Sequence, residues 1–337
     1  MPTPPTGAQW GRPPGRPAHT RPDAPRLPRR TDPQPEEPHA ATDGTGVNHL
    51  PSNHEPLATR PGGTTSGSTT APVPTASGIF PVWLREDLKR ETALQYWKGP
   101  HAQIVARLPG ITEYLQHHFS PTDHGYWPSS PTVGTAVPPN WRCDGIAEVR
   151  MASMVAALTI PVHMREVYLD EQNVFDRVLG NLTGPRAGRW WTDGHDAGVG
   201  HRTVLLLRRR RGVSRRAFRR YVHDRIGPAL HEAGVRDLRT YTFLPWTSLP
   251  HLTPGVSHEN PTFRRYHGCV VLGAGNRSAV AEILASQQVA ELVADQHTVM
   301  TAVHAFAVEH TEPVIRTGPL VRRGQDRLRV SGPIDRC

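Results

Sequence analysis

Apolar residues change their spacing several times after residue 78, and each change predicts a new element. Short apolar runs bounded by Gly and Pro predict strands, and apolar residues three or four apart predict amphipathic helices. The expected elements are a strand at 79–82, a helix that ends near Pro109, strands at 114–119 and 145–151 separated by a Pro- and Gly-rich loop at 120–143, helical sequence at 174–179 and a weak closing strand.

The same order of elements returns about 125 residues later. Aligned at this offset, 79–82 meets 204–207 and Tyr96 meets Tyr221, while 144–147 corresponds to 267–270. Such an internal repeat decides the interpretation of the whole fold. The second series contains an amphipathic helix within 214–230, a strand at 240–244, a Pro- and Gly-rich loop at 245–266, a strand at 268–273, helical sequence at 278–285 and a clear closing strand at 302–309.

The order βαββαβ, present twice, predicts an α+β fold made of two ferredoxin-like repeats. Each repeat forms a four-stranded antiparallel sheet with helices on one face and leaves the other face bare. We expect the two bare faces to pack sheet to sheet, as an α+β barrel of the dimeric type formed within one chain, with a cavity between them. The loops 120–143 and 245–266 would lie at the rim of that cavity.

Composition divides the chain into a tail and a foldable part. Residues 1–78 hold 17 of the 35 prolines but only seven residues among Val, Ile, Leu, Met, Phe, Trp, Tyr and Cys. A segment with so little apolar surface is expected to be disordered. The predicted domains are the tail at 1–78, a first repeat at 79–198, a second and degenerate repeat at 199–315 and a basic tail at 316–337.

No apolar run is long enough for a transmembrane helix, and no secretory signal is recognisable, so we expect a cytoplasmic protein without a membrane partner. The three cysteines lack metal-binding spacing and predict reduced thiols. The net charge of +9 is concentrated in arginines on the helix at 214–230 and in the C-terminal tail. A solvated helix face explains this pattern better than a nucleic-acid surface, since no nucleic-acid-binding motif accompanies it.

Three short stretches resemble the EthD domain family. They are Pro-Val-Trp-Leu at 81–84, Tyr-Trp-Lys-Gly-Pro-His-Ala at 96–102, and Leu-Pro-Gly-Ile at 108–111 followed by Tyr114. The second half, through 206–209 and 218–221, resembles a degenerate copy. The resemblance implies the dimeric α+β barrel superfamily, whose EthD-like members include accessory factors of ether degradation and cofactor-independent enzymes that dehydrate or decarboxylate aromatic polyketides. It therefore implies little about the reaction and leaves open both an accessory role and lyase-type chemistry without a cofactor.

His101 is the first candidate for a catalytic residue. It lies four residues after Trp97, on the helix face defined by Leu94, Trp97, Val105 and Leu108, so a titratable ring points at the core. Its counterpart in the second half is Ile226, so an aliphatic residue satisfies the packing there. Histidine is also the side chain best suited to proton transfer near neutral pH. A structural role, with the ring hydrogen-bonded to the backbone, is the alternative.

Other candidates lie on the predicted strands. Adjacent His117 and His118 face opposite sides, and Tyr114 shares a side with His118. Asp144 and Glu148 share a face near the third strand, where a carboxylate could orient a histidine. The remaining candidates for ligand binding are Tyr96, Trp97, Tyr241, His267 and His304.

Metal and dinucleotide sites are not predicted. The close histidine pairs are adjacent or six residues apart, which does not suit a zinc ion. Gly273-Ala274-Gly275 precedes a helix but lacks the third glycine of a dinucleotide loop.

The leading hypothesis is a cofactor-independent enzyme that binds a small apolar or aromatic molecule and uses His101, a strand histidine and Asp144 or Glu148 for elimination or decarboxylation. A non-catalytic ligand-binding or accessory protein that supports a partner oxygenase is the second hypothesis. An arginine-mediated nucleic-acid binder is the third. Because both halves belong to one chain, a monomer is expected to suffice for the barrel.

Overall fold

The computed structural model describes residues 73–191, 198–246 and 253–316, so the predicted tails lie almost entirely outside the described residues. The first half begins at Val73, six residues before the predicted boundary. Its elements are β1 (Val73–Leu84), α1 (Arg90–Tyr96), η1 (Trp97–His101), α2 (Ala102–Ala106), β2 (Ile111–His124), η2 (Pro139–Trp141), β3 (Gly145–Met151), α3 (Met154–Thr159), η3 (Ile160–His163), α4 (Arg165–Glu171), β4 (Phe175–Val178) and β5 (Asn181–Trp190).

The second half repeats this order after β5. Its elements are β6 (His201–Arg209), α5 (Arg215–Tyr221), η4 (Val222–Ile226), α6 (Gly227–Glu232), β7 (Asp237–Phe243), η5 (Thr262–Arg264), β8 (Gly268–Ala274), α7 (Arg277–Leu284), α8 (Gln287–Asp295), η6 (Gln296–Thr298) and β9 (Met300–Arg316). Both η1 and η4 are π-helical turns, and they lie 125 residues apart.

Eight antiparallel strands close into a barrel in the order β1-β3-β2-β9-β6-β8-β7-β5 and back to β1, and β4 pairs with the last residues of β1, Val82 to Leu84, beyond the part of β1 that pairs with β5. The strands of the first half pair in the order β4-β1-β3-β2, and those of the second in the matching order β9-β6-β8-β7. The pairs β2–β9 and β5–β7 join the two halves. The prediction of an α+β barrel closed within one chain is confirmed.

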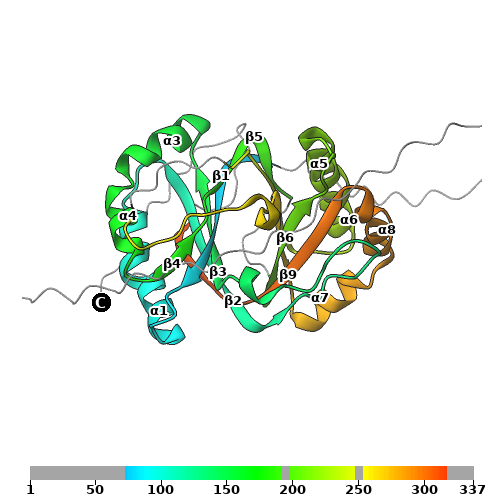
Figure 1. The fold of residues 1–337 in the computed structure, drawn as a ribbon. Helices are drawn as coiled ribbons and strands as arrows, with labels where there is room; N and C mark the ends of the chain where they lie inside the picture. The colour runs from blue at the N-terminus through cyan, green and yellow to red at the C-terminus, as the bar shows by residue number, and fades with distance from the viewer. Residues whose placement is uncertain (1–72, 192–197, 247–252, 317–337) are drawn as a thin grey trace, which may run out of the picture. The chain divides into compact units, whose positions relative to one another are not determined.

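Helices cover the outside of the barrel on two opposite sides (Figure 1). α1, α3 and α4 cover the first half, and α5 to α8 cover the second. Several of these helices begin where a side-chain oxygen accepts the otherwise unpaired N–H of the first turn, as expected for an N-cap residue. The capping residues are Ser153, Ser214, Asn276 and Ser286.

The predicted helical sequence at 174–179 is wrong: residues 175–178 form β4, which pairs with β1. A short apolar run has no periodicity that separates a buried strand from a helix, so packing decides. The helices of this stretch are α3 and α4, earlier in the chain. The poorly defined closing strand corresponds to β4, and β5 is a further strand that completes the barrel.

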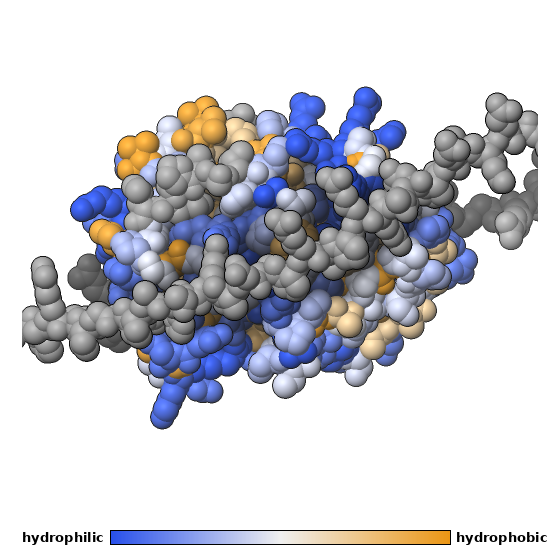
Figure 2. Space-filling view, in the orientation of Figure 1, coloured by the Kyte–Doolittle hydropathy of each residue, from blue (hydrophilic) through white to orange (hydrophobic). Residues whose placement is uncertain are grey.

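Apolar side chains lie on the outer surface of α3 and η3 as well as on their inner surface. Val155, Leu158 and Val162 are between 69% and 81% exposed, and Figure 2 shows apolar side chains gathered over α3. Ala157 and Ile160 of the same segment face inward. None of the helices described here combines the length and the apolar character that crossing a bilayer requires.

Candidate functional site

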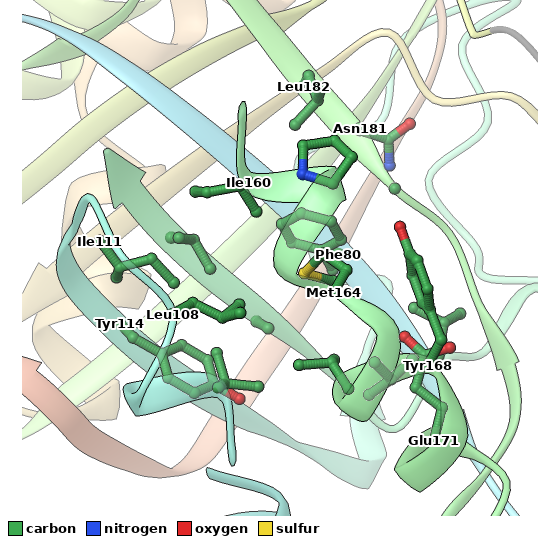
Figure 3. Close-up of a pocket in the computed structure, with 18 of the residues that line it drawn as sticks. Phe80, Leu108, Ile111, Tyr114, Ile160, Met164, Tyr168, Glu171, Asn181 and Leu182 are labelled. Atoms are coloured by element: carbon green, nitrogen blue, oxygen red, sulfur yellow. The ribbon is translucent and has the colours of Figure 1, made fainter. Parts of the chain in front are cut away.

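A cavity of about 240 Å³ lies between the first half's helices and the outer face of its strands (Figure 3). Its walls are mostly apolar and come from β1, β2 and β3 on one side and from η1, α2, η3 and α4 on the other. Leu244, Pro245 and Trp246, at the start of the predicted loop 245–266, close one end. A molecule somewhat larger than benzene fits, since a cavity of about 150 Å³ suffices for benzene.

The sequence placed this cavity between the two sheets, and the structure corrects that position. The space between the sheets is filled by a core cluster to which all eight barrel strands contribute, including Phe119, Ile146, Leu206 and Phe306. An eight-stranded barrel is narrow enough for side chains to fill its interior. The room for a ligand is therefore under the helices, outside the barrel.

His101 lines the cavity and is buried, with 4% of its surface exposed. It is the last residue of the π-helical turn η1, and its ring packs edge-on against Phe175 with 5.2 Å between ring centroids. π-helical turns are frequent at functional sites because they displace side chains from regular helical positions. The structure thus presents an imidazole to an apolar cavity.

Asp170 on α4 holds the His101 ring. His101 Nδ1 lies 2.8 Å from Asp170 Oδ2, and Tyr96 donates its hydroxyl hydrogen to Asp170 Oδ1 at 2.6 Å. The Asn173 side-chain amide donates to the same oxygen at 3.0 Å. Burial disfavours the carboxylate, but the hydrogen bonds from His101, Tyr96 and Asn173 outweigh burial and lower the pKa of Asp170.

This arrangement fixes the chemistry of the ring. An ionised Asp170 is only an acceptor, so Nδ1 of His101 carries a hydrogen and donates it. Nε2 is then the basic atom of the neutral ring. A histidine oriented in this way by a buried carboxylate can take a proton from a bound molecule, because the carboxylate stabilises the imidazolium that forms.

Glu171, next to Asp170, also lines the cavity and is 5% exposed. Its Oε2 accepts a hydrogen bond from the Thr253 hydroxyl at 3.1 Å. Burial is the main cause that raises the pKa of Glu171, to about 8, and the nearby charge of Asp170 adds to it. Two neighbouring carboxyl groups therefore have pKa values shifted in opposite directions.

Trp97 and Tyr114, two predicted ligand-binding residues, line the cavity, whereas His118 stacks on the far side of Trp97 with 4.7 Å between centroids. The predicted sharing of a face by Tyr114 and His118 is what the structure shows. Gln116 donates to the Tyr114 hydroxyl at 2.8 Å and to the Trp97 carbonyl at 2.9 Å. Burial is the largest cause that lowers the pKa of His118, to about 3, so this ring is neutral near pH 7.

His117, Glu148 and Tyr241 meet inside the barrel, away from the cavity. His117 Nε2 lies 2.7 Å from Glu148 Oε2, and the Tyr241 hydroxyl donates to Glu148 Oε1. Arg239 Nη1 is 3.1 Å from the same carboxylate and its guanidinium lies over the Trp190 ring. Burial opposes the charge of Glu148, but Arg239, His117 and Tyr241 outweigh burial and lower its pKa.

The other predicted site residues lie apart from the cavity. Asp144 accepts from the Leu84 backbone N–H at 2.9 Å and pairs with Arg90, so it fixes the end of β1. Two further histidines belong to the second half and have pKa values lowered to about 4, chiefly by burial. His267 accepts from the Arg209 backbone N–H at 3.2 Å, and His304 contacts the Tyr266 hydroxyl at 2.6 Å.

Sequence reasoning missed Asp170 and Glu171. They lie 69 and 70 residues after His101, on a helix that the sequence did not predict. One signal was available: at the offset of 125, Asp170 corresponds to Asp295 at the end of a helix that is well patterned in the second half.

Within residues 73–191, 198–246 and 253–316, no group of three or more His, Cys, Asp or Glu side chains is arranged to hold a metal ion. His101 and Asp170 form a pair rather than such a group.

No family model and no curated protein matches the sequence. Solved structures resemble the fold at low identity. A proposed monooxygenase from Lactobacillus acidophilus NCFM aligns with TM-score 0.45 and 9% identity, over 75% of this chain and 100% of its own. One from Fusobacterium nucleatum aligns with TM-score 0.45 and 8% identity, over 73% and 96%. An anthrone oxidase-like protein gives 0.45 and 8%, over 71% and 94%.

Proposed function

We propose that this chain is an enzyme that moves a proton on a small, largely apolar molecule held in the cavity, with His101 as the general base. The observation that carries the proposal is the buried His101–Asp170 pair at the wall of an apolar cavity. A buried aliphatic residue, Ile226, stands at the matching position of the second half, so packing alone does not require a histidine.

A side chain that is held close to a bound molecule can take a proton from it or give a proton to it without a cofactor. The apolar walls exclude water and strengthen the attraction between the His101 ring and Asp170. Dehydration next to a carbonyl begins with such a step, whereas decarboxylation releases carbon dioxide first and then takes up a proton at carbon. Both reactions need a positioned proton-transfer group, and the resemblance of 96–102 to the EthD domain points in the same direction. Dehydration or decarboxylation of an aromatic, polyketide-like molecule is the finer form of the proposal.

We also propose that the two halves are repeats derived from one ferredoxin-like unit. Their strands pair in the same internal order, and their π-helical turns coincide at the offset of 125. In this view the first half keeps the site, and the second half supports it by closing the barrel.

Hydrogen exchange at carbon tests the proposed reaction. A panel of small aromatic ketones, acetophenone among them, is incubated with the protein in deuterated water, and NMR measures deuterium uptake next to the carbonyl group. General-base catalysis contributes about 10²–10⁴-fold, so His101→Gln should lower the enzymatic rate by at least about a hundredfold. His163→Gln, which removes an exposed histidine from the neighbouring turn η3, is the matched control. Equal rates for wild type and His101→Gln would refute the role of His101.

A ligand-binding or accessory protein is the second candidate, favoured by the apolar character of the cavity, which suffices for binding without chemistry. The isolated protein would then bind a ligand and return it unchanged. Support of a partner oxygenase by such binding would require a reaction that proceeds only with both proteins present.

A further inference from the structure

Glu171 contacts a loop that belongs to the second half of the chain. Its Oε2 accepts from Thr253, and the same loop forms a parallel bridge between Ser257 and Arg177 of β4. His258 of this loop also approaches Glu171, with 3.8 Å between Nε2 and Oε2, while its Nδ1 donates to the Val178 carbonyl at 2.9 Å. A loop of the second half is thereby held against the end of α4 and against β4.

The second half contains the matching arrangement, with an amide in place of the acid. Gln296 lies 125 residues after Glu171 and is fully buried. Its Oε1 accepts from Trp127 Nε1 at 2.8 Å, and its Nε2 donates to Ser130 Oγ at 2.8 Å, so it holds the loop of the first half. That loop forms the parallel bridge between Gly134 and Ala302.

A neutral amide therefore suffices for holding the loop. Glu171 lines the cavity, and its carboxyl group is costly to bury when it is ionised. Gln296 does not line the cavity described here. The contact with the loop therefore does not explain why residue 171 is a glutamic acid. A carboxylic acid offers what an amide cannot: a proton that can be transferred.

We propose that Glu171 is the proton donor of the cavity, and that the ligand is a small apolar molecule with a carbonyl or hydroxyl oxygen placed against it. The proposal rests on the proposed function in that the cavity binds a small molecule. Tyr168, Glu171 and Asn181 lie along one side of the cavity, and Leu108, Ile111 and Tyr114 lie on another (Figure 3). The ligand oxygen would thus meet the polar side while its apolar body contacts the rest.

Burial and the surrounding titratable groups determine the protonation of Glu171. Asp170 and Tyr168 belong to its own helix, His258 faces it from the loop, and His101 and Tyr114 line the same cavity. Burial raises the pKa of Glu171 to about 8, with a further contribution from Asp170.

With both groups in place, the reaction balances without an oxidant. Nε2 of His101 takes a proton from the carbon next to the carbonyl, and the electrons of the C–H bond form a carbon–carbon double bond. The carbonyl oxygen receives the electron pair of its π bond and takes the proton of Glu171, which gives an enol. Return of the two protons restores the acid and the base.

Matched probes test Glu171 through binding alone. Acetophenone and ethylbenzene have similar shapes, but only acetophenone has an oxygen that can accept a hydrogen bond. Dissociation constants are measured by NMR titration at about pH 7 and about pH 9.5, both above the ordinary histidine pKa of ~6.5. Wild type should prefer acetophenone by about tenfold at the lower pH, as a buried hydrogen bond allows, and should lose this preference at the higher pH.

Two variants distinguish the effect of the titratable proton of Glu171 from the effect of the shape of its side chain. Glu171→Gln, which copies the residue at 296, keeps a donor that does not titrate, so its preference should be the same at both pH values. Glu171→Leu should show no preference at either pH. A wild-type preference that is absent at the lower pH or unchanged at the higher pH, or a preference that persists in Glu171→Leu, would overturn the proposal. So would failure of both probes to bind wild type at millimolar concentration.

The outcome is independent of His101. If wild type prefers acetophenone to ethylbenzene in the pH-dependent way but the methyl hydrogens of acetophenone do not exchange, the proposed function fails and the assignment of Glu171 as donor stands. If deuterium exchange depends on His101 but wild type shows no preference for acetophenone, the proposed function stands and the assignment of Glu171 as donor fails.

Discussion

The raised pKa of Glu171 makes the stability of the protein depend on pH in a way that one substitution removes. The ordinary value is 4.5 and the folded value is about 8. Folded protein therefore binds this proton more tightly than unfolded protein. The contribution of Glu171 to the free energy of unfolding is fully present below pH 4.5 and is lost as pH rises through the interval up to about 8.

The magnitude follows from the width of that interval. One pKa unit corresponds to about 1.4 kcal/mol, so an interval of about 3.5 units gives a loss of up to about 5 kcal/mol between acid and alkaline solution. Glu171→Gln has no charge to bury. Relative to wild type it should gain stability by about 1.4 kcal/mol per pH unit across the interval and reach a plateau above about pH 8.

Urea unfolding of both proteins between about pH 5 and about pH 9 measures the difference, because groups that titrate equally in both proteins cancel. Glu166→Gln is the control: Glu166 lies on the same helix, but its side chain is 72% exposed and pairs with exposed Arg107. Its curve should parallel that of wild type. If Glu171→Gln also parallels wild type from pH 5 to 9, the reasoning about Glu171 is refuted.

Three further changes test other parts of the structure. Arg239→Met leaves Glu148 without its cationic partner inside the barrel and should lower the free energy of unfolding by about 3–5 kcal/mol in urea titrations. Gly145→Ala places a Cβ atom 2.4 Å from the His117 carbonyl oxygen and should cost about 1–3 kcal/mol, seen as a lower melting temperature. Asp170→Asn keeps one oxygen to accept from Tyr96 and Asn173 and turns its NH2 group toward His101 Nδ1, which favours the wrong tautomer of the ring, so deuterium exchange should slow by about 10⁴-fold while the dissociation constant of acetophenone stays within about twofold.

Local patterns sufficed to predict much of the barrel. The third strand of each half was placed nearly residue for residue, at 145–151 and at 268–273, because a continuous apolar run between turns leaves few alternatives. The repeat then fixed the order of the remaining elements. Where the pattern was short and apolar, as at 174–179, spacing alone could not separate strand from helix.

The barrel interior was beyond sequence reasoning for a different reason. Glu148 stands between Ala147 and Val149, and Arg239 follows Leu238; a charged residue at such a place on a strand usually marks a face exposed to water. In this fold both faces are covered, one by helices and one by the opposite strands, so the polar face is buried. Arg239 pairs with Asp237 of its own strand, but Glu148 is satisfied by His117, Tyr241 and Arg239 from other strands, and such partners leave no mark in the local sequence.

Three residues singled out from the sequence, His101, Trp97 and Tyr114, line one cavity, which lies outside the barrel and not between the sheets as predicted. The pairing of His101 with Asp170 depends on a helix packing against η1, which is a tertiary contact without local signal.

The two halves share one framework, and two positions where they differ belong to the proposed site. Ile226 and Gln296 are buried and satisfied in the second half by apolar neighbours and by amide hydrogen bonds. The first half has His101 and Glu171 at the corresponding places, both more demanding to bury, and both at the wall of a cavity. Since the second half shows that the framework does not require titratable groups there, the cost of burying them is best explained by what they do to a bound molecule.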